Sequence, residues 1–156
     1  MSPEVPMGQF ILTALSERRA ALALLVLAAG ACSSRAEAGG NMTGKGASFT
    51  LTSSAFQPGA SIPSRFTCDG AGSAPPLAWS GAPAGTKSFA LIADDPDAPD
   101  PKAPKVTWVH WVLYDIPASA HSLPEGVTSQ TLPAGTREGV NGWKKPGYGG
   151  PCPPIG

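Results

Sequence analysis

This sequence has no excess charge, few histidines and few cysteines, and each shortage argues against a class of function. Lysine plus arginine and aspartate plus glutamate both number 11 among 156 residues, so the formal net charge is zero. A protein that binds nucleic acid needs a basic surface to neutralise phosphates, and we therefore expect no nucleic-acid partner. With two histidines and three cysteines, a Cys/His metal site is poorly supplied. We expect neither a metal nor another cofactor.

Helical segments are also missing. After residue 40, no stretch long enough for a helix shows an amphipathic helical period without a glycine or proline. The chain instead has apolar, β-branched and aromatic runs, notably "SFTLTSSAF", "KSFALIADD" and "VTWVHWVLYDIP". Turn signals follow the last of these runs at "LPEG", "LPAG" and "VNGW". This pattern predicts an all-β domain of the sandwich or barrel type.

The N-terminal segment lacks an apolar run of the length that spans a membrane, which is about 20 residues. Arg18 and Arg19 precede a shorter apolar run, Ala20 to Ala29, and small residues follow it up to Cys32. This order is typical of a secretory signal. A cysteine directly after the small residues resembles a bacterial lipoprotein signal, in which Cys32 would carry the lipid. Ordinary cleavage near Ala31 or Ala38 is the alternative.

These features divide the chain into three predicted parts. Residues 1–32 are a signal segment with a lipoprotein-type processing site. Residues 33–48 are small, polar and Gly-rich, as expected for a flexible linker. Residues 49–156 form the folded domain.

Export would place the domain where disulfides persist. If Cys32 carries lipid, Cys68 and Cys152 remain as the candidate pair. Such a bridge would close a long loop and contribute roughly 4 kcal/mol on the chain-entropy model. Two buried free thiols are the alternative.

The candidate functional residues lie in "DDPDAP" and in the "WVHW" run that follows. Strand alternation places His110 on the same face as Trp108, and Asp95 stands at the end of the preceding strand. On these residues alone a structural role is favoured. Asp95 and Asp97 would form an Asx-turn, and His110 would be a core or pocket residue.

Several motifs together resemble the phosphatidylethanolamine-binding protein family, and most closely its bacterial branch of Raf-kinase-inhibitor-like proteins. The motifs are "FTCDG", "PPLAWSG", "DPDAP", "WVHW", "LPEG" and "GYGGPCPPIG", which appear in this order between Phe49 and Gly156. The resemblance implies an antiparallel two-sheet sandwich with a small anion-binding pocket at one end. Asp95 and His110 would be its polar residues, Trp108 a wall, and Asp97 a support for the turn.

The resemblance also implies a rim formed by the Gly150–Pro154 loop, with Gly150, Pro151 and Pro153 as ligand-binding residues. In the family, this loop leads into a strand that begins with a histidine, and a C-terminal helix usually follows. The sequence ends at Gly156, before that histidine. We therefore expect a domain of this type that is incomplete at the C-terminus and binds its ligand weakly or not at all.

The functional hypothesis is an exported, lipid-anchored protein that binds a small anion or a phospholipid head group and has a regulatory role. It would lie in the bacterial cell envelope, either membrane-anchored or soluble in the periplasm. One alternative is an inhibitor that acts on a protease or kinase through surface loops, and a protein partner is left open. A hydrolase that uses the Asp95–His110 pair is a further alternative, although no G-x-S-x-G nucleophile is present. We expect no enzymatic activity.

Overall fold

The computed structural model describes residues 9–16, 48–99 and 105–152. These residues form strands and one short 3-10 helix, η1, in an order that contains no α-helix within the described ranges. In chain order the elements are β1 (Gln9–Leu15), β2 (Thr50–Thr52), η1 (Ser64–Phe66), β3 (Leu77–Ser80), β4 (Ser88–Ala98), β5 (Val106–Pro117), β6 (Ser122–Leu123) and β7 (Arg137–Glu138).

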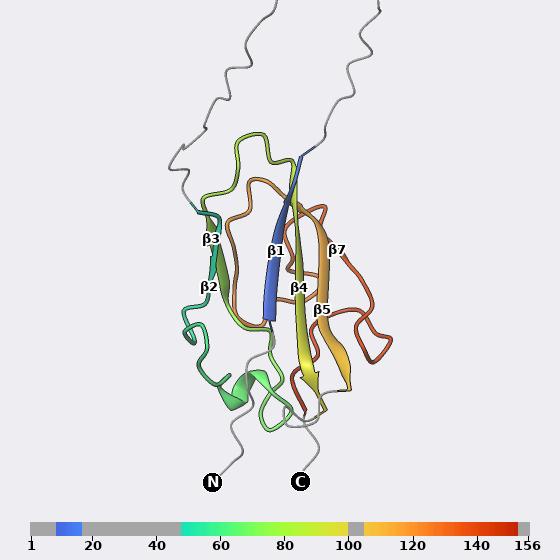
Figure 1. The fold of residues 1–156 in the computed structure, drawn as a ribbon. Helices are drawn as coiled ribbons and strands as arrows, with labels where there is room; N and C mark the ends of the chain where they lie inside the picture. The colour runs from blue at the N-terminus through green and yellow to red at the C-terminus, as the bar shows by residue number, and fades with distance from the viewer. Residues whose placement is uncertain (1–8, 17–47, 100–104, 153–156) are drawn as a thin grey trace, which may run out of the picture.

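The strands form two antiparallel sheets (Figure 1). The four-stranded sheet has the order β1-β4-β5-β7, and the three-stranded sheet has the order β2-β3-β6. All the strand pairs are antiparallel. The prediction of an all-β fold with two antiparallel sheets is confirmed.

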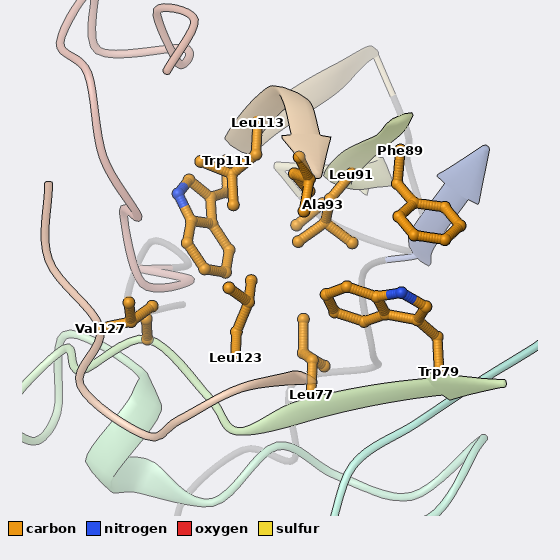
Figure 2. Close-up of a cluster of buried hydrophobic side chains, with 11 residues drawn as sticks. Leu77, Trp79, Phe89, Leu91, Ala93, Trp111, Leu113, Leu123 and Val127 are labelled. Carbon is orange, nitrogen blue, oxygen red and sulfur yellow. The ribbon is translucent and has the colours of Figure 1, made fainter. Parts of the chain in front are cut away.

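The hydrophobic core lies between the two sheets (Figure 2). Trp111 and Leu113 of β5 and Leu91 of β4 extend from the larger sheet, and each is at most 1% exposed. Leu77 and Trp79 of β3 approach them from the smaller sheet. Alternate residues of each strand therefore bury their side chains between the sheets, as in a β-sandwich.

The two longest strand candidates in the sequence become β4 and β5, which pair at the centre of the larger sheet. The expected turns form as well. Backbone hydrogen bonds close them from Val127 N to Pro124 O, from Thr136 N to Pro133 O, and from Lys144 N to Asn141 O. These parts follow from local residue preferences.

Strand β1 was not expected from the sequence, because it lies within the segment assigned to a signal. It pairs with β4 without interruption from Gln9↔Asp94 to Leu15↔Ser88. Phe10, Leu12 and Ala14 pack against the core, while the alternate residues Ile11 and Leu15 are exposed. This alternation suits the edge of a sheet that is covered on one face. The predicted division at residues 32 and 48 stays a prediction.

Candidate functional site

The candidate site begins at an irregularity in the pairing of β4 with β5. Ala93 pairs with Trp111, but the next residue, Asp94, pairs with Val109, so His110 has no partner across the ladder. A bulge of this kind redirects side chains and is frequent beside functional sites. At this position His110 and Trp111, which are adjacent in sequence, are both buried, with exposed fractions of 5% and 1%.

The loop after β7 holds both the backbone and the side chain of His110 through hydrogen bonds with Gly149. The amide of Gly149 donates to the carbonyl oxygen of His110 at 2.9 Å. In return, His110 Nδ1 lies 2.8 Å from the carbonyl oxygen of Gly149. Because a carbonyl oxygen only accepts, the proton of the neutral ring must sit on Nδ1. The second ring nitrogen, Nε2, is thereby left as an acceptor.

Two polar atoms at this position are buried and have no hydrogen-bond partner among the described residues. They are His110 Nε2 and Asp94 Oδ1. Buried polar atoms are normally paired with protein or solvent, and unpaired ones cost free energy. Both residues line the same pocket, and a bound polar ligand would explain unpaired polar atoms there.

The pocket around these atoms is small and partly open to solvent, with a cavity volume of about 10 Å³. One water molecule needs about this much space, so the pocket as it stands suits only a very small ligand. Asp94, His110 and Tyr148 give the pocket its polar side chains. The other lining residues are Phe10, Ile62, Ala93 and Pro151.

The electrostatics of His110 reflect opposing effects. Burial lowers the pKa of His110 from its ordinary value of 6.5. The Gly149 carbonyl and the negative charges of Asp95 and Asp94 act in the other direction, but they do not reverse the shift. The imidazole is therefore mainly neutral at pH 7 and would gain a proton readily if an anion were bound beside it.

Tyr148 is fixed by a long-range contact. Its hydroxyl donates to the carbonyl oxygen of Phe66 at 2.9 Å. Burial also raises the pKa of Tyr148 well above its usual range, so the hydroxyl stays protonated. Its single proton is committed to Phe66, and the side chain therefore contributes mainly a wall to the pocket.

The predicted carboxylates occupy the turn that follows the bulge. Asp95 Oδ1 accepts a hydrogen bond from the amide of Asp97 at 2.9 Å, which is the expected Asx-turn geometry. Asp95 is close enough to raise the pKa of His110 by its charge. However, the carboxylate that lines the pocket belongs to Asp94, and neither Asp95 nor Asp97 is among the lining residues.

The residue predicted as a wall does not line the pocket, whereas one of the residues predicted for the rim does. Trp108 packs against Trp143 with ring centroids 5.2 Å apart and does not line the pocket. Trp143 also packs against His110, with a distance of 5.6 Å between the ring centroids. On the rim, Pro151 lines the pocket, whereas Pro153 lies outside the described residues.

Gly150 has a packing role beside the rim. A Cβ atom added at Gly150 would come within 2.7 Å of the carbonyl oxygen of Phe66, a distance at which something must move. The absence of a side chain therefore lets this loop lie directly against the segment that follows η1.

The expected disulfide is present. Cys68 and Cys152 are bonded, with their Cα atoms 5.2 Å apart and 84 positions apart in sequence. The amide of Cys68 also donates to the carbonyl oxygen of Pro151 at 3.0 Å. Together these contacts fix the rim loop to the η1 segment. The acylation expected at Cys32 falls outside the described residues.

Sequence reasoning missed Phe10, Ile62, Asp94 and Tyr148. Asp94 is adjacent to the predicted Asp95, and Tyr148 lies within the quoted "GYGG" motif. Both residues therefore belong to motifs that the sequence analysis had identified. The bulge that turns Asp94 and His110 to one pocket has no sequence signal that we could have used.

In the described part of the chain, no three metal-binding side chains come together, and no helix has the length and hydropathy needed to cross a membrane.

Comparison with known families adds one match that covers most of the folded part. The sequence model described as "Phosphatidylethanolamine-binding protein" matches residues 52–156. This range contains β3 to β7 and every described pocket residue except Phe10.

Individual relatives agree with this match. A "UPF0098 protein" of Aquifex aeolicus is 44% identical over 71% of this chain and 62% of its own length. The "Putative lipoprotein LppC" of Mycobacterium tuberculosis is 43% identical over 69% of this chain and 48% of its own length. The matches thus span about half to two thirds of these relatives.

A solved structure is similar as well. The crystal structure of Escherichia coli YbcL, described as a member of the mammalian PEBP family, superposes with a TM-score of 0.63 at 37% sequence identity. The superposition covers 70% of both chains. The sandwich described above is therefore shared with a solved structure.

Proposed function

This chain belongs to the phosphatidylethanolamine-binding protein family, and from this membership we propose that it binds a small anion or a phosphorylated head group in the pocket of Asp94 and His110. The observation that carries the proposal is the buried Nε2 atom of His110, which has no partner among the described residues. His110 is also one of the residues that line a small pocket. Protonated Nε2 would donate a charge-assisted hydrogen bond to an anion.

The neighbouring carboxylate restricts which anions fit. Asp94 Oδ1 is buried and unpaired, and an ionised carboxylate only accepts hydrogen bonds. A fully ionised ligand would be repelled by it. A ligand that carries both an acceptor and a donor, such as monohydrogen phosphate, would accept from His110 and donate to Asp94. This pairing favours phosphate monoesters and free phosphate over anions that have no proton to give.

A titration with inorganic phosphate tests the proposal. Trp143 lies 5.6 Å from His110 between ring centroids, so its fluorescence should report occupancy of the site. We expect saturable quenching that is lost in His110→Ala. The His121→Ala variant is the matched control, since His121 is an exposed histidine outside the pocket. Equal responses of the two variants would contradict the assignment of the site.

The same titration separates the remaining alternatives. Release of free phosphate from an aryl phosphate probe, lost in His110→Ala, would favour a hydrolase. A normal response to phosphate in His110→Ala, combined with inhibition of a protease or kinase by the unaltered chain, would favour an inhibitor that acts through surface loops. Either outcome would replace the binding proposal.

We also propose that the protein is exported and anchored through a lipid on Cys32. Support comes from the order of residues before Cys32 and from the name of the mycobacterial relative, "Putative lipoprotein LppC". Intact mass measurement of protein purified from bacterial membranes should find acylated Cys32 as the first residue. An unmodified N-terminus at a later position, in a protein recovered from the periplasm, would show ordinary cleavage instead.

A further inference from the structure

The N-terminal strand β1 supplies one wall of the candidate site. Its first pairs with β4 are Gln9↔Asp94 and Phe10↔Ala93, which places Phe10 beside the two β4 residues that line the pocket. Phe10 is itself a lining residue, together with His110. The only described residue from the N-terminal segment that reaches the site is therefore an aromatic one.

The ring of Phe10 stands against other apolar groups. It lies 6.2 Å from the ring of Phe56, measured between centroids, and it packs on the hydrophobic core. Asp94 and His110, whose atoms Oδ1 and Nε2 have almost no exposure to solvent, line the same pocket as Phe10. An apolar ring offers these atoms no hydrogen bond, and burying them unpaired costs free energy.

Strand β1 lies at the edge of the larger sheet. Within its sheet it pairs only with β4, and its outer edge has no partner among the described strands. Ile11 and Leu15 are 44% and 45% exposed. Removal of an edge strand leaves the β4–β5 ladder and its hydrogen bonds in place, and such edges are usually among the less stable parts of a fold.

From these observations we infer that Phe10 is a cover over the anion site and that β1 is its removable carrier. The inference rests on the function proposed above, because processing before Cys32 would remove residues 9–15 with the signal segment. The unprocessed chain then holds a covered site, and the mature chain holds an open one. Binding would be suppressed until export is complete.

Chemical modification of histidine tests the cover without any ligand. Diethyl pyrocarbonate acylates a neutral imidazole nitrogen that solvent can reach, and His110 presents Nε2 because Nδ1 is bonded to Gly149. In the full chain at neutral pH, Phe10→Ala should raise the modification rate of His110 several-fold. The exposed His121 is the internal reference, and its rate should not change.

Leu12→Ala is the matched control. Leu12 lies on the same face of β1 and packs on the core, but it does not line the pocket. It should leave the rate of His110 unchanged. Should Phe10→Ala unfold the domain, as near-ultraviolet circular dichroism would show, Phe10→Leu provides the test, with a smaller rise in a folded protein. An unchanged rate in the folded Phe10 variant, or an equal rise in Leu12→Ala, would overturn the inference.

A phosphate titration of the same variants keeps the two proposals apart. If both hold, Phe10→Ala should bind inorganic phosphate several-fold more tightly than the unaltered chain. If no variant binds phosphate but Phe10→Ala still exposes His110 to acylation, the cover stands and the proposed ligand is wrong. If phosphate binds equally to both proteins and acylation is unchanged, the ligand proposal stands and the cover is wrong.

Discussion

At the scale of single residues, the site depends on the two nitrogens of one imidazole. Nδ1 is bonded to the Gly149 carbonyl, which fixes the ring and the tautomer. Nε2 is buried without a partner among the described residues. The first nitrogen gives the histidine a structural role and the second leaves it available for a ligand, so the two roles predicted as alternatives from the sequence are compatible.

The pKa of His110 makes stability depend on pH in a defined direction. Burial lowers this pKa below 6.5, so between the two values the unfolded chain binds a proton that the folded chain does not. The contribution of neutral, buried His110 to the free energy of unfolding is fully present above pH 6.5. It is lost as the pH falls through 6.5 toward the folded-state pKa.

We expect His110→Gln to remove this part of the pH dependence. Urea unfolding of both proteins on either side of pH 6.5 measures it, because the comparison isolates the contribution of His110 from that of the rest of the chain. The unaltered protein should lose more stability on acidification than the variant. The opposite order would mean that the carboxylates dominate and hold the ring protonated.

At the scale of elements, β1 and β4 show what the sequence could and could not predict. The run "KSFALIADD" predicts a strand because it is apolar and follows a turn, and β4 includes all of it except Lys87. The residues of β1 have the same apolar character, but they precede two arginines and an apolar run that indicate a signal. These residues form a strand because β4 has a free edge that can pair with them. That edge is a property of the folded sheet and cannot be seen in the local sequence.

The bulge was beyond prediction for a related reason. Strict alternation along β5 places His110 and Trp111 on opposite faces, and both are buried because the loop of Trp143 and Gly149 packs on His110. The register of the pairing shifts where Ala93 pairs with Trp111 and Asp94 with Val109, since one strand carries an extra residue. Asp94 lines the pocket, one position before the predicted Asp95, whose role in ligand binding stays a prediction.

Substitutions on the two faces of β1 should have unequal effects. Leu12 packs on the core opposite the fully buried Leu91, so Leu12→Asp would place a charge against apolar groups and should cost about 2 kcal/mol or more. Ile11 is 44% exposed, and Ile11→Asp should change stability by less than about 0.5 kcal/mol.

Hydrogen exchange would locate this effect. In Leu12→Asp we expect faster exchange for the β4 amides that face β1 than in Ile11→Asp, while β5 amides stay protected. Uniform acceleration across both central strands would show that β1 is an integral part of the cooperative unit and cannot leave alone.

At the scale of the whole molecule, the rim of the site is tied to a segment more than half the chain away. The ties are the disulfide between Cys68 and Cys152, the hydrogen bond from Cys68 to Pro151, and the bond from Tyr148 to Phe66. All of them join the loop that holds His110 to the residues around η1. The position of the imidazole therefore depends on long-range contacts and on the pairing of β4 with β5.

The disulfide should be the largest single contribution among these ties. It joins residues 84 positions apart, and the chain-entropy estimate for a loop of this size is about 4 kcal/mol. We expect Cys68→Ser, Cys152→Ser and the double variant to lose similar stability, each near this value, in urea unfolding under oxidising conditions. Reductant should lower the stability of the unaltered protein by the same amount and leave the variants unchanged.

Because the bridge holds the rim against η1, His110 should also be acylated faster in the variants than in the unaltered protein. The acylation rate of His121 should be the same in all of these proteins. Loss of stability without any change at His110 would mean that the hydrogen bonds from Tyr148 and Gly149 are sufficient to hold the site.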